Sequence, residues 1–237
     1  MNLLELSLPT IEENLAADEA LLLEAEKQTT EVMRLWEWPK PAVILGAGCR
    51  IHDDVNEGAC ATDGVPILRR SSGGGTVLLG QGCLCFSLVL SYHHAPELSE
   101  IRPAYAYILE RARRALRELA PGIECTGTSD LAAAGCKFSG NAQQRKRHHL
   151  LHHGTILYDF DLALVSRYLR LPSRQPTYRR QRGHGDFLMN LPVKSPELKR
   201  RLRSAWQADS SLTTWPEELV RNLVAEKYSR EDWIRRR

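Results

Sequence analysis

The sequence predicts an α+β domain with a mixed, mostly antiparallel sheet flanked by helices. Two long segments carry apolar residues at helical spacing, and short runs of aliphatic and β-branched residues lie between and after them. Helices and strands do not alternate strictly, which argues against a doubly wound parallel sheet. The 237 residues are 43% hydrophobic and 26% charged, a composition that provides for a sizeable core.

The first half of the chain is predicted to hold two helices and four strand-like runs. The helix over residues 11–27 places apolar side chains among acidic ones. The helix over residues 103–119 begins at Pro103, a residue type that suits the first helical turn. The strand-like runs lie at residues 32–38, 41–48, 64–70 and 76–92, the last with a glycine break in its middle.

The second half is predicted to continue the sheet and to end in helices. Residues 123–143 indicate a strand, a turn around Gly135 and a second strand. Residues 150–160 indicate a further strand, followed by a helix over residues 162–169. Charged helices are predicted at residues 195–206 and 216–229.

Bulk properties exclude several classes of protein. A net charge of +3 is too small to require a nucleic-acid partner. The first residues lack the basic region of a signal peptide, and no run approaches the roughly 20 apolar residues of a membrane span. Six scattered cysteines without a CxxC pair favour reduced thiols in a cytoplasmic protein.

The stretch RRSSGGGTV, residues 69–77, is a candidate anion site. Glycines let backbone N–H groups approach a ligand closely, and successive N–H groups form an anion-binding concavity. Arg69 and Arg70 add guanidinium groups that bind carboxylate or phosphate in a bidentate manner. The motif matches neither dinucleotide nor P-loop patterns, so a purely structural turn stays open as the alternative.

Lys137 lies in an otherwise uncharged, strand-like stretch, GCKFSGNAQ. If this segment pairs in a sheet, the ammonium is partly buried and needs an anionic partner. A bound acyl phosphate or carboxylate would provide one, whereas an edge-strand lysine needs none. Asp130, a few residues upstream, is suited to hold a metal, accept from an amine or cap a turn.

Four histidines, His148, His149, His152 and His153, superficially resemble a zinc pattern. The residues after them read as a strand, in which positions i and i+4 lie too far apart to share one ion. We therefore expect no metal site built by a protein cluster, and one or two histidines that line a pocket or satisfy buried hydrogen bonds.

Three ordered motifs together resemble the lipoate–protein ligase A and octanoyltransferase family, in the superfamily of the biotin–protein ligases. They are ENLAADEALL, then WEWPKPAVILGAGC with RRSSGGGTV, and then SDLAAAGCKFSGNAQQRKRHHLLHHGTILYDFDL. The resemblance implies a class II biotin/lipoyl ligase-like catalytic domain over residues 1–195. Residues 196–237 are then a short helical extension rather than a full accessory domain.

The resemblance also implies roles for individual residues. Lys137 corresponds to the lysine that binds the acyl carbonyl and phosphate, and Asp130 to an aspartate near the adenylate and Mg²⁺. The implied substrate- and adenylate-binding residues are Arg70, Ser72, Gly73, Gly74, Gly75, Thr76, Val77, Ser139, Gly140, His152, His153 and Gly154.

The activity that the resemblance implies is a ligase that uses ATP and Mg²⁺ to activate lipoate or octanoate as an acyl adenylate. The acyl group then passes to a lysine of a lipoyl domain or a glycine-cleavage-H-like protein. An ATP-independent octanoyl or lipoyl transferase is the alternative, with Cys125 as thioester nucleophile ahead of the lysine strand. A non-catalytic homologue that binds acyl groups or carrier proteins is a third interpretation.

The sequence departs from the family pattern at three points. Leu79 replaces a histidine of the family, and Cys83 replaces an asparagine of the ligases. The C-terminal part is too short for an accessory domain, so we expect either a separate accessory chain, a compact ligase or a transferase. The basic segment Tyr178–His184 is expected to cover the active site or to dock the acceptor.

Overall fold

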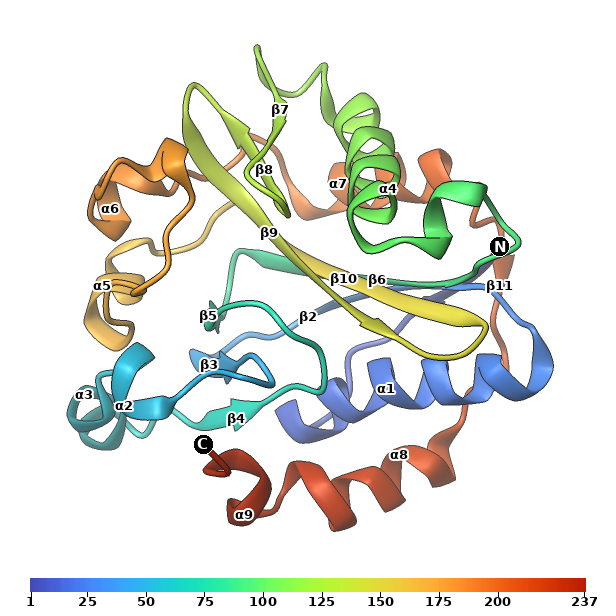
Figure 1. Cartoon of the computed structure of the whole chain (residues 1–237), viewed down its shortest axis with the longest axis horizontal. Helices are drawn as coiled ribbons and strands as arrows, with labels where there is room; N and C mark the ends of the chain where they lie inside the picture. The colour runs from blue at the N-terminus through green and yellow to red at the C-terminus, as the bar shows by residue number, and fades with distance from the viewer.

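The computed structural model describes residues 1–237, with eleven strands and nine α-helices (Figure 1). The strands are β1 (Asn2–Glu5), β2 (Val32–Glu37), β3 (Ala42–Leu45), β4 (Ile67–Arg69), β5 (Val77–Leu79), β6 (Cys83–Ser91), β7 (Glu124–Thr126), β8 (Asp130–Ala133), β9 (Cys136–Arg145), β10 (His149–Leu157) and β11 (Ser210–Ser211). The helices are α1 (Ile11–Gln28), α2 (Ile51–Asp54), α3 (Glu57–Asp63), α4 (Ile101–Leu116), α5 (Ala163–Tyr168), α6 (His184–Phe187), α7 (Ser195–Trp206), α8 (Glu217–Leu223) and α9 (Glu231–Ile234). Short 3-10 turns lie at Pro96–Ser99 and Thr177–Arg179, and a π-helical turn at Val224–Tyr228.

Two sheets form the framework. The large sheet has the order β11-β1-β2-β6-β10-β9-β8-β7, and the small sheet has the order β4-β3-β5. In the large sheet only β1 pairs in parallel, with β2 and with β11, and every other pair is antiparallel. This mixed, mostly antiparallel sheet with flanking helices confirms the predicted fold class.

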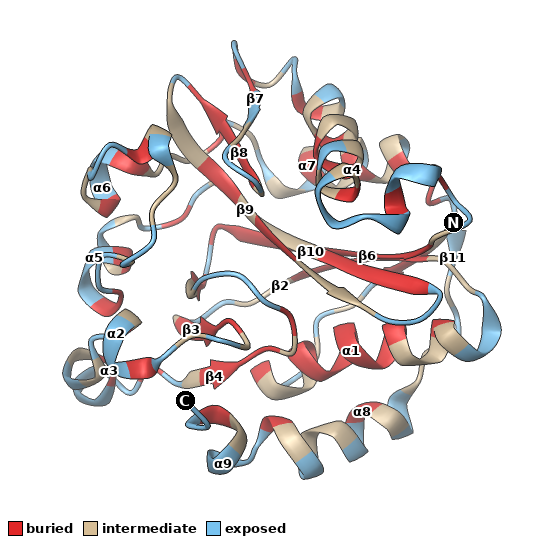
Figure 2. Ribbon diagram, viewed as in Figure 1, coloured by how far each residue is buried: buried red, intermediate tan, exposed pale blue.

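The large sheet is covered on both faces, and the two faces carry separate cores (Figures 1 and 2). On the α1 face, Cys83 and Cys85 of β6 pack with α1 and the small sheet. On the α4 face, Leu84 and Phe86 of the same strand pack with α4 and α7. Because side chains alternate along a strand, neighbouring residues serve opposite faces, and this alternation decides which residues meet in the site.

Helix α1 begins at a capping box that its sequence encodes. Thr10 Oγ1 accepts from the backbone N–H of Glu13 (3.2 Å), and the Glu13 carboxylate accepts from the N–H of Thr10 (2.9 Å). The helix then buries most of one side, including the acidic residues Asp18 and Glu19. Two buried carboxylates in an amphipathic helix require partners: Asp18 pairs with Arg34, and Glu19 pairs with Lys227.

The predicted helices and strands from α4 onward are present with small shifts of their ends, except that the strand predicted before Gly135 is divided into β7 and β8. Helix α4 begins at Ile101, which leaves Pro103 in its first turn. The C-terminal helices pack on the sheet layers: Trp206 of α7 is buried in the α4-face core, and Tyr228 and Ile234 are buried in the α1-face core. No helix of the structure has the length and apolar content needed to span a membrane.

Candidate active site

A lysine–aspartate pair occupies the α1 face where β8 and β9 meet. Asp130 pairs with Gly140, but a bulge at Phe138 brings Lys137 opposite Ala132, on the face that Asp130 occupies. Lys137 Nζ lies 2.7 Å from Asp130 Oδ1, with 26% of the lysine side chain exposed. The anionic partner that the sequence required for Lys137 is therefore Asp130.

Tyr178 closes one side of this pair. Its hydroxyl donates to Asp130 Oδ2 at 2.8 Å, and burial together with the Asp130 charge raises its pKa well above the usual value. The basic segment that contains it is held over β9 by Arg182, which donates to the carbonyl of Gly135 at 2.7 Å. The segment thus lies against the lysine–aspartate pair, one of the two positions predicted for it.

The glycine-rich loop, residues 71–76, is held from below by Arg70. This guanidinium is buried, and it donates to the carbonyls of Gly73 (2.6 Å), Gly75 (2.8 Å) and Ile44 (3.3 Å) and to Ser72 Oγ (3.0 Å). Burial lowers the Arg70 pKa to about 10, so the group keeps its charge at neutral pH. Arg70 in this structure supports the loop from within.

The same loop leaves backbone donors free. The N–H groups of Gly73, Gly74 and Gly75 donate to no acceptor of the protein, and the three residues are exposed. The carbonyls of Gly73 and Gly75 accept hydrogen bonds from the Arg70 guanidinium. A run of unpaired N–H groups beside a fixed cation is the arrangement that binds phosphate or carboxylate oxygens.

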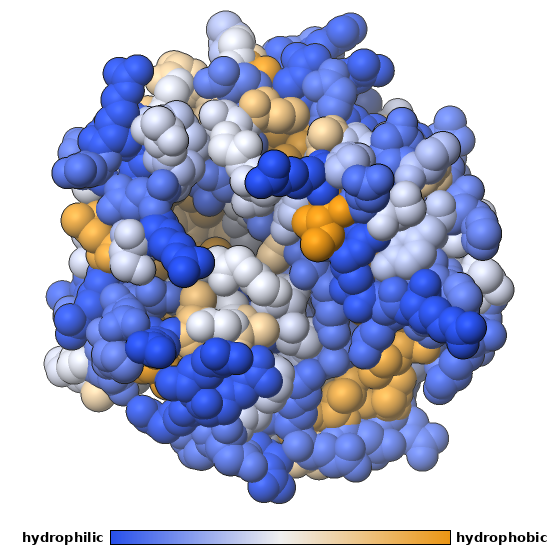
Figure 3. Space-filling model, viewed as in Figure 1, coloured by the Kyte–Doolittle hydropathy of each residue, from blue (hydrophilic) through white to orange (hydrophobic).

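Close contacts place this loop and the lysine on the same face of β9. A Cβ on Gly74 would lie 3.4 Å from the Cβ of Ala142, and a Cβ on Gly140 would lie 2.7 Å from Lys137 Nζ. Along β9 the ammonium, Gly140, Ala142 and the loop therefore follow one another on the α1 face. The surface is hollowed in this region, between β5, β9 and α6 (Figure 3).

Thr76 at the end of the loop contacts α2, and Val77 directly after the loop belongs to the small sheet. Thr76 Oγ1 donates to Asp54 Oδ2 at 2.6 Å, and Val77 begins β5, where it pairs with Ile44. Leu79 and Cys83, which depart from the family pattern, are both buried in the α1-face core. These residues connect the loop to its framework.

Several residues predicted for the site lie on the α4 face instead. Ser139 and His152 pair at positions that turn their side chains away from Lys137, and Gly154 is covered there by Asn141. His152 packs edge-on against Tyr105 of α4, and burial lowers its pKa to about 3. His152 is thus neutral and structural in this structure.

Cys125, the predicted nucleophile of the transferase alternative, is also on the far face. It pairs with Leu131, whose side chain lies in the α4-face core, while Asp130 points the other way. Burial and the nearby Glu110 carboxylate raise its pKa, which disfavours the thiolate. The structure does not bring Cys125 together with Lys137.

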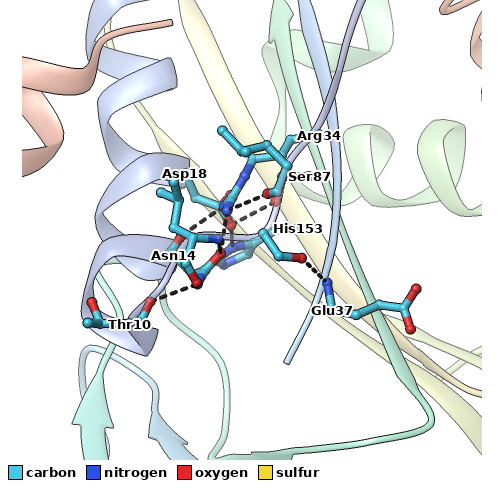
Figure 4. Close-up of polar contacts among 10 residues, drawn as sticks. Thr10, Asn14, Asp18, Arg34, Glu37, Ser87 and His153 are labelled. Carbon is cyan, nitrogen blue, oxygen red and sulfur yellow. Dashed lines mark hydrogen bonds and ion pairs between the residues drawn. The ribbon is translucent and has the colours of Figure 1, made fainter. Parts of the chain in front are cut away.

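A buried network that the sequence patterns did not predict ties the loop to α1. Figure 4 shows its part around Asp18, Arg34, Ser87 and His153. Asp18 accepts from Arg34 (2.7 Å) and Ser87 (2.7 Å) and contacts His153 Nδ1 (3.1 Å). His153 Nε2 in turn lies 2.6 Å from Ser72 Oγ in the glycine-rich loop. The signal available was a pair of acidic residues, Asp18 and Glu19, in an otherwise apolar helical stretch, AADEALLL.

The protein matches known sequences over most of its length. The family described as lipoyl protein ligase A/B catalytic domain matches residues 10–195. The chain belongs to this family. The resemblance noted in the sequence is thereby confirmed, and the protein is an enzyme of the lipoate ligase and octanoyltransferase family.

Individual relatives carry both kinds of name. "Octanoyltransferase LipM" of Carboxydothermus hydrogenoformans is 29% identical over 94% of this chain and 93% of its own length. A crystal structure of lipoate–protein ligase A bound with ATP superposes with a TM-score of 0.79 and 26% identity over 99% of this chain and 98% of its own. A bi-partite lipoate protein ligase of Thermoplasma acidophilum, described with its E2 lipoyl domain, has a TM-score of 0.81 at 24% identity over 99% and 95% of the two chains, and shows the shared fold.

Proposed function

We propose that this enzyme is a lipoate–protein ligase that activates lipoate or octanoate with ATP and transfers the acyl group to a lysine of an acceptor protein. The observation that carries the proposal is the shared face of Lys137 and the free N–H groups of Gly73–Gly75. A fixed ammonium and unpaired backbone donors together suit the phosphate and carbonyl oxygens of an acyl adenylate. The structural likeness to an ATP-bound ligase supports it.

The proposed reaction has two steps. The carboxylate of the acyl group attacks the α-phosphate of ATP, a P–O bond forms, and pyrophosphate leaves. The neutral amine of the acceptor lysine then attacks the acyl carbonyl, an amide C–N bond forms, the C–O bond to AMP breaks, and the amine proton passes to solvent. In both steps negative charge grows on oxygens that the loop N–H groups and Lys137 would stabilise, while Asp130 and Tyr178 orient the ammonium.

Magnesium fits this site only together with the nucleotide. Both Asp130 oxygens are engaged, by Lys137 and by Tyr178, and no group of three potential metal ligands exists. Mg²⁺ is commonly held by one or two carboxylates plus substrate phosphates. Asp130 is the residue that would contribute such a carboxylate oxygen, and the ion would neutralise phosphate charge.

The same proposal extends to the acceptor protein, the bounds of the catalytic unit and the cellular compartment. A lipoyl domain or a glycine-cleavage-H-like protein would present the lysine, in line with the lipoyl domain described for the Thermoplasma relative. We further propose that residues 1–195 are the catalytic unit, that residues 196–237 extend it, and that the enzyme works in the cytoplasm. That relative is described as bi-partite, so a separate accessory chain belongs to the same proposal.

An ATP-independent octanoyltransferase is the second candidate. The octanoyltransferase relative covers nearly the whole chain, which is the observation in its favour. A thioester route needs a thiolate beside the acyl carbonyl, and Cys125 lies on the opposite face. Cys49 does contact the loop, donating to the Gly74 carbonyl at 3.4 Å, but burial raises its pKa.

The test measures the intact mass of an apo lipoyl domain after incubation with the enzyme. One reaction contains octanoate or lipoate with ATP and Mg²⁺, and the other contains octanoyl carrier protein without ATP. Modification in the first reaction alone establishes the ligase, and modification in the second alone establishes the transferase. If neither reaction modifies the domain, even with an accessory chain added, the enzyme assignment fails and a binding homologue remains.

A further inference from the structure

The last residues of the chain contact the base of the glycine-rich loop. Trp233 Nε1 donates to the carbonyl of Arg69 at 2.9 Å, and Arg69 Nε donates to the carbonyl of Ile234 at 2.9 Å. Arg69 is fully buried, and it also donates to the carbonyls of Gly46 (2.9 Å) and Cys49 (2.8 Å). Arg69 therefore joins the C-terminal helix α9, the turn at residues 46–49 and the glycine-rich loop.

The turn at residues 46–49 transmits this support to the loop. The N–H of Ala47 donates to the Ser72 carbonyl at 2.8 Å, and Arg236 donates to the Ala47 carbonyl at 2.8 Å. A Cβ on Gly46 would lie 2.0 Å from the Gly74 carbonyl oxygen, so the turn and the loop are in direct backbone contact. Movement of α9 would thus reach the free N–H groups through two hydrogen bonds.

A second attachment runs through α1. Tyr228 and Lys227 both donate to Glu19 Oε2 at 2.7 Å, and the Glu19 carboxylate also accepts from Gln144 at 3.4 Å. Gln144 in turn accepts from the hydroxyl of Ser71 at 2.5 Å. Ser71 is thus tied to the C-terminal segment, while its neighbour Ser72 is tied to Asp18 through His153.

We propose that residues 227–236, here named the C-terminal brace, are positioning residues that set the conformation of the glycine-rich loop for its anionic ligand. The family match ends at residue 195, so the brace lies outside the part that carries the family motifs. It touches none of the reacting atoms and acts through Arg69, Ala47 and Glu19. The nature of the ligand rests on the proposed function, whereas the support of the loop does not.

Two conservative variants remove donors while keeping the rings. Trp233→Phe deletes the bond to the Arg69 carbonyl, and Tyr228→Phe deletes the bond to Glu19. Tyr92→Phe is the matched control, because the Tyr92 hydroxyl donates to the Lys146 carbonyl away from the loop. Hydrogen–deuterium exchange of peptides covering residues 68–80 is measured in the full chain without ligand, beside peptides from β6 and β10.

The proposal predicts faster exchange of the hydrogen-bonded amides of the loop peptide alone, among them Arg70, which donates to the Leu45 carbonyl, by about fivefold for each variant, the factor that one net hydrogen bond contributes. Steady-state kinetics with ATP and octanoate should show a raised KM with kcat nearly unchanged, and Tyr92→Phe should alter neither. Unchanged exchange in the loop peptide, or equally accelerated exchange in the β6 and β10 peptides, overturns the proposal. If the wild-type enzyme is inactive with ATP, only the proposed function fails, because the exchange experiment needs no turnover.

Discussion

Asp18 and His153 contact each other at 3.1 Å although 135 residues separate them in the sequence. The contact joins α1 to β10 beneath the glycine-rich loop. The other ring nitrogen of His153 contacts the hydroxyl of Ser72 in that loop. Burial alone would raise the Asp18 pKa, but Arg34, His153 and Ser87 together bring it below its usual value. A charged carboxylate is therefore the native form, and the loop depends on it.

Asp18→Asn should destabilise the fold strongly, by about 3–5 kcal/mol, because it leaves the buried Arg34 without its counter-charge. Urea unfolding at neutral pH measures this loss. Ser87→Ala, which removes one neutral donor to the same carboxylate, should cost only about 1 kcal/mol. Equal losses in the two variants would contradict the assignment of Arg34 and Asp18 as a buried ion pair.

The same pair predicts a pH dependence of stability. The Asp18 pKa is lower in the folded than in the unfolded chain, so its contribution is complete above the unfolded value of 3.8. It is lost as the pH falls through the lower folded pKa. The difference in unfolding free energy between wild type and Asp18→Asn should thus be constant near neutral pH and shrink below about pH 4. A difference that stays constant down to pH 2 would argue against the ionised form.

Lys137→Ala should abolish acyl transfer, with a loss of at least about 100-fold in kcat, the range observed when one stabilising donor is removed. The measured quantity is the initial rate of acceptor modification by intact mass. Lys146→Ala is the matched control, since Lys146 is an exposed lysine that directly follows the same strand. Comparable rates for wild type and Lys137→Ala would remove Lys137 from the mechanism in either enzyme class.

Gly74→Ala and Gly73→Ala form a pair that tests the loop conformation. Gly74 has φ +84° and its Cβ would lie 3.0 Å from Arg70, whereas a Cβ on Gly73 meets nothing within 4 Å. We expect KM for ATP to rise about five- to thirtyfold more in Gly74→Ala, in keeping with about 1–2 kcal/mol of backbone strain. Similar KM values for both variants would show that the loop adapts freely.

Cys125→Ser separates the two candidate functions. If the enzyme is a ligase, the variant should keep its rate with ATP and octanoate, because the thiol lies on the α4 face. The assay is repeated with octanoyl carrier protein as donor. A loss of activity with both donors would place Cys125 in the chemistry and would require β7 to rearrange before reaction.

The sheet and the main helices could be predicted from the hydrophobic periodicity of the sequence, and the three motifs could be recognised in it directly. The face on which each residue lies could not, since it depends on strand register. His152 and Ser139 belong to motifs that also hold His153 and Lys137, yet they serve the α4-face core. The role of Arg70 and the role of the C-terminal brace depend on tertiary contacts, which no local sequence pattern encodes.

The single extra residue at Phe138 decides on which face of the large sheet the Lys137 side chain lies. With it, the ammonium of Lys137 and Gly140 share one face across an odd separation. Without this bulge, the same odd separation would place Lys137 and Gly140 on opposite faces and turn the ammonium under α4, among Leu131 and Ile156. Substitutions in this short stretch should therefore be tolerated only where the bulge is kept.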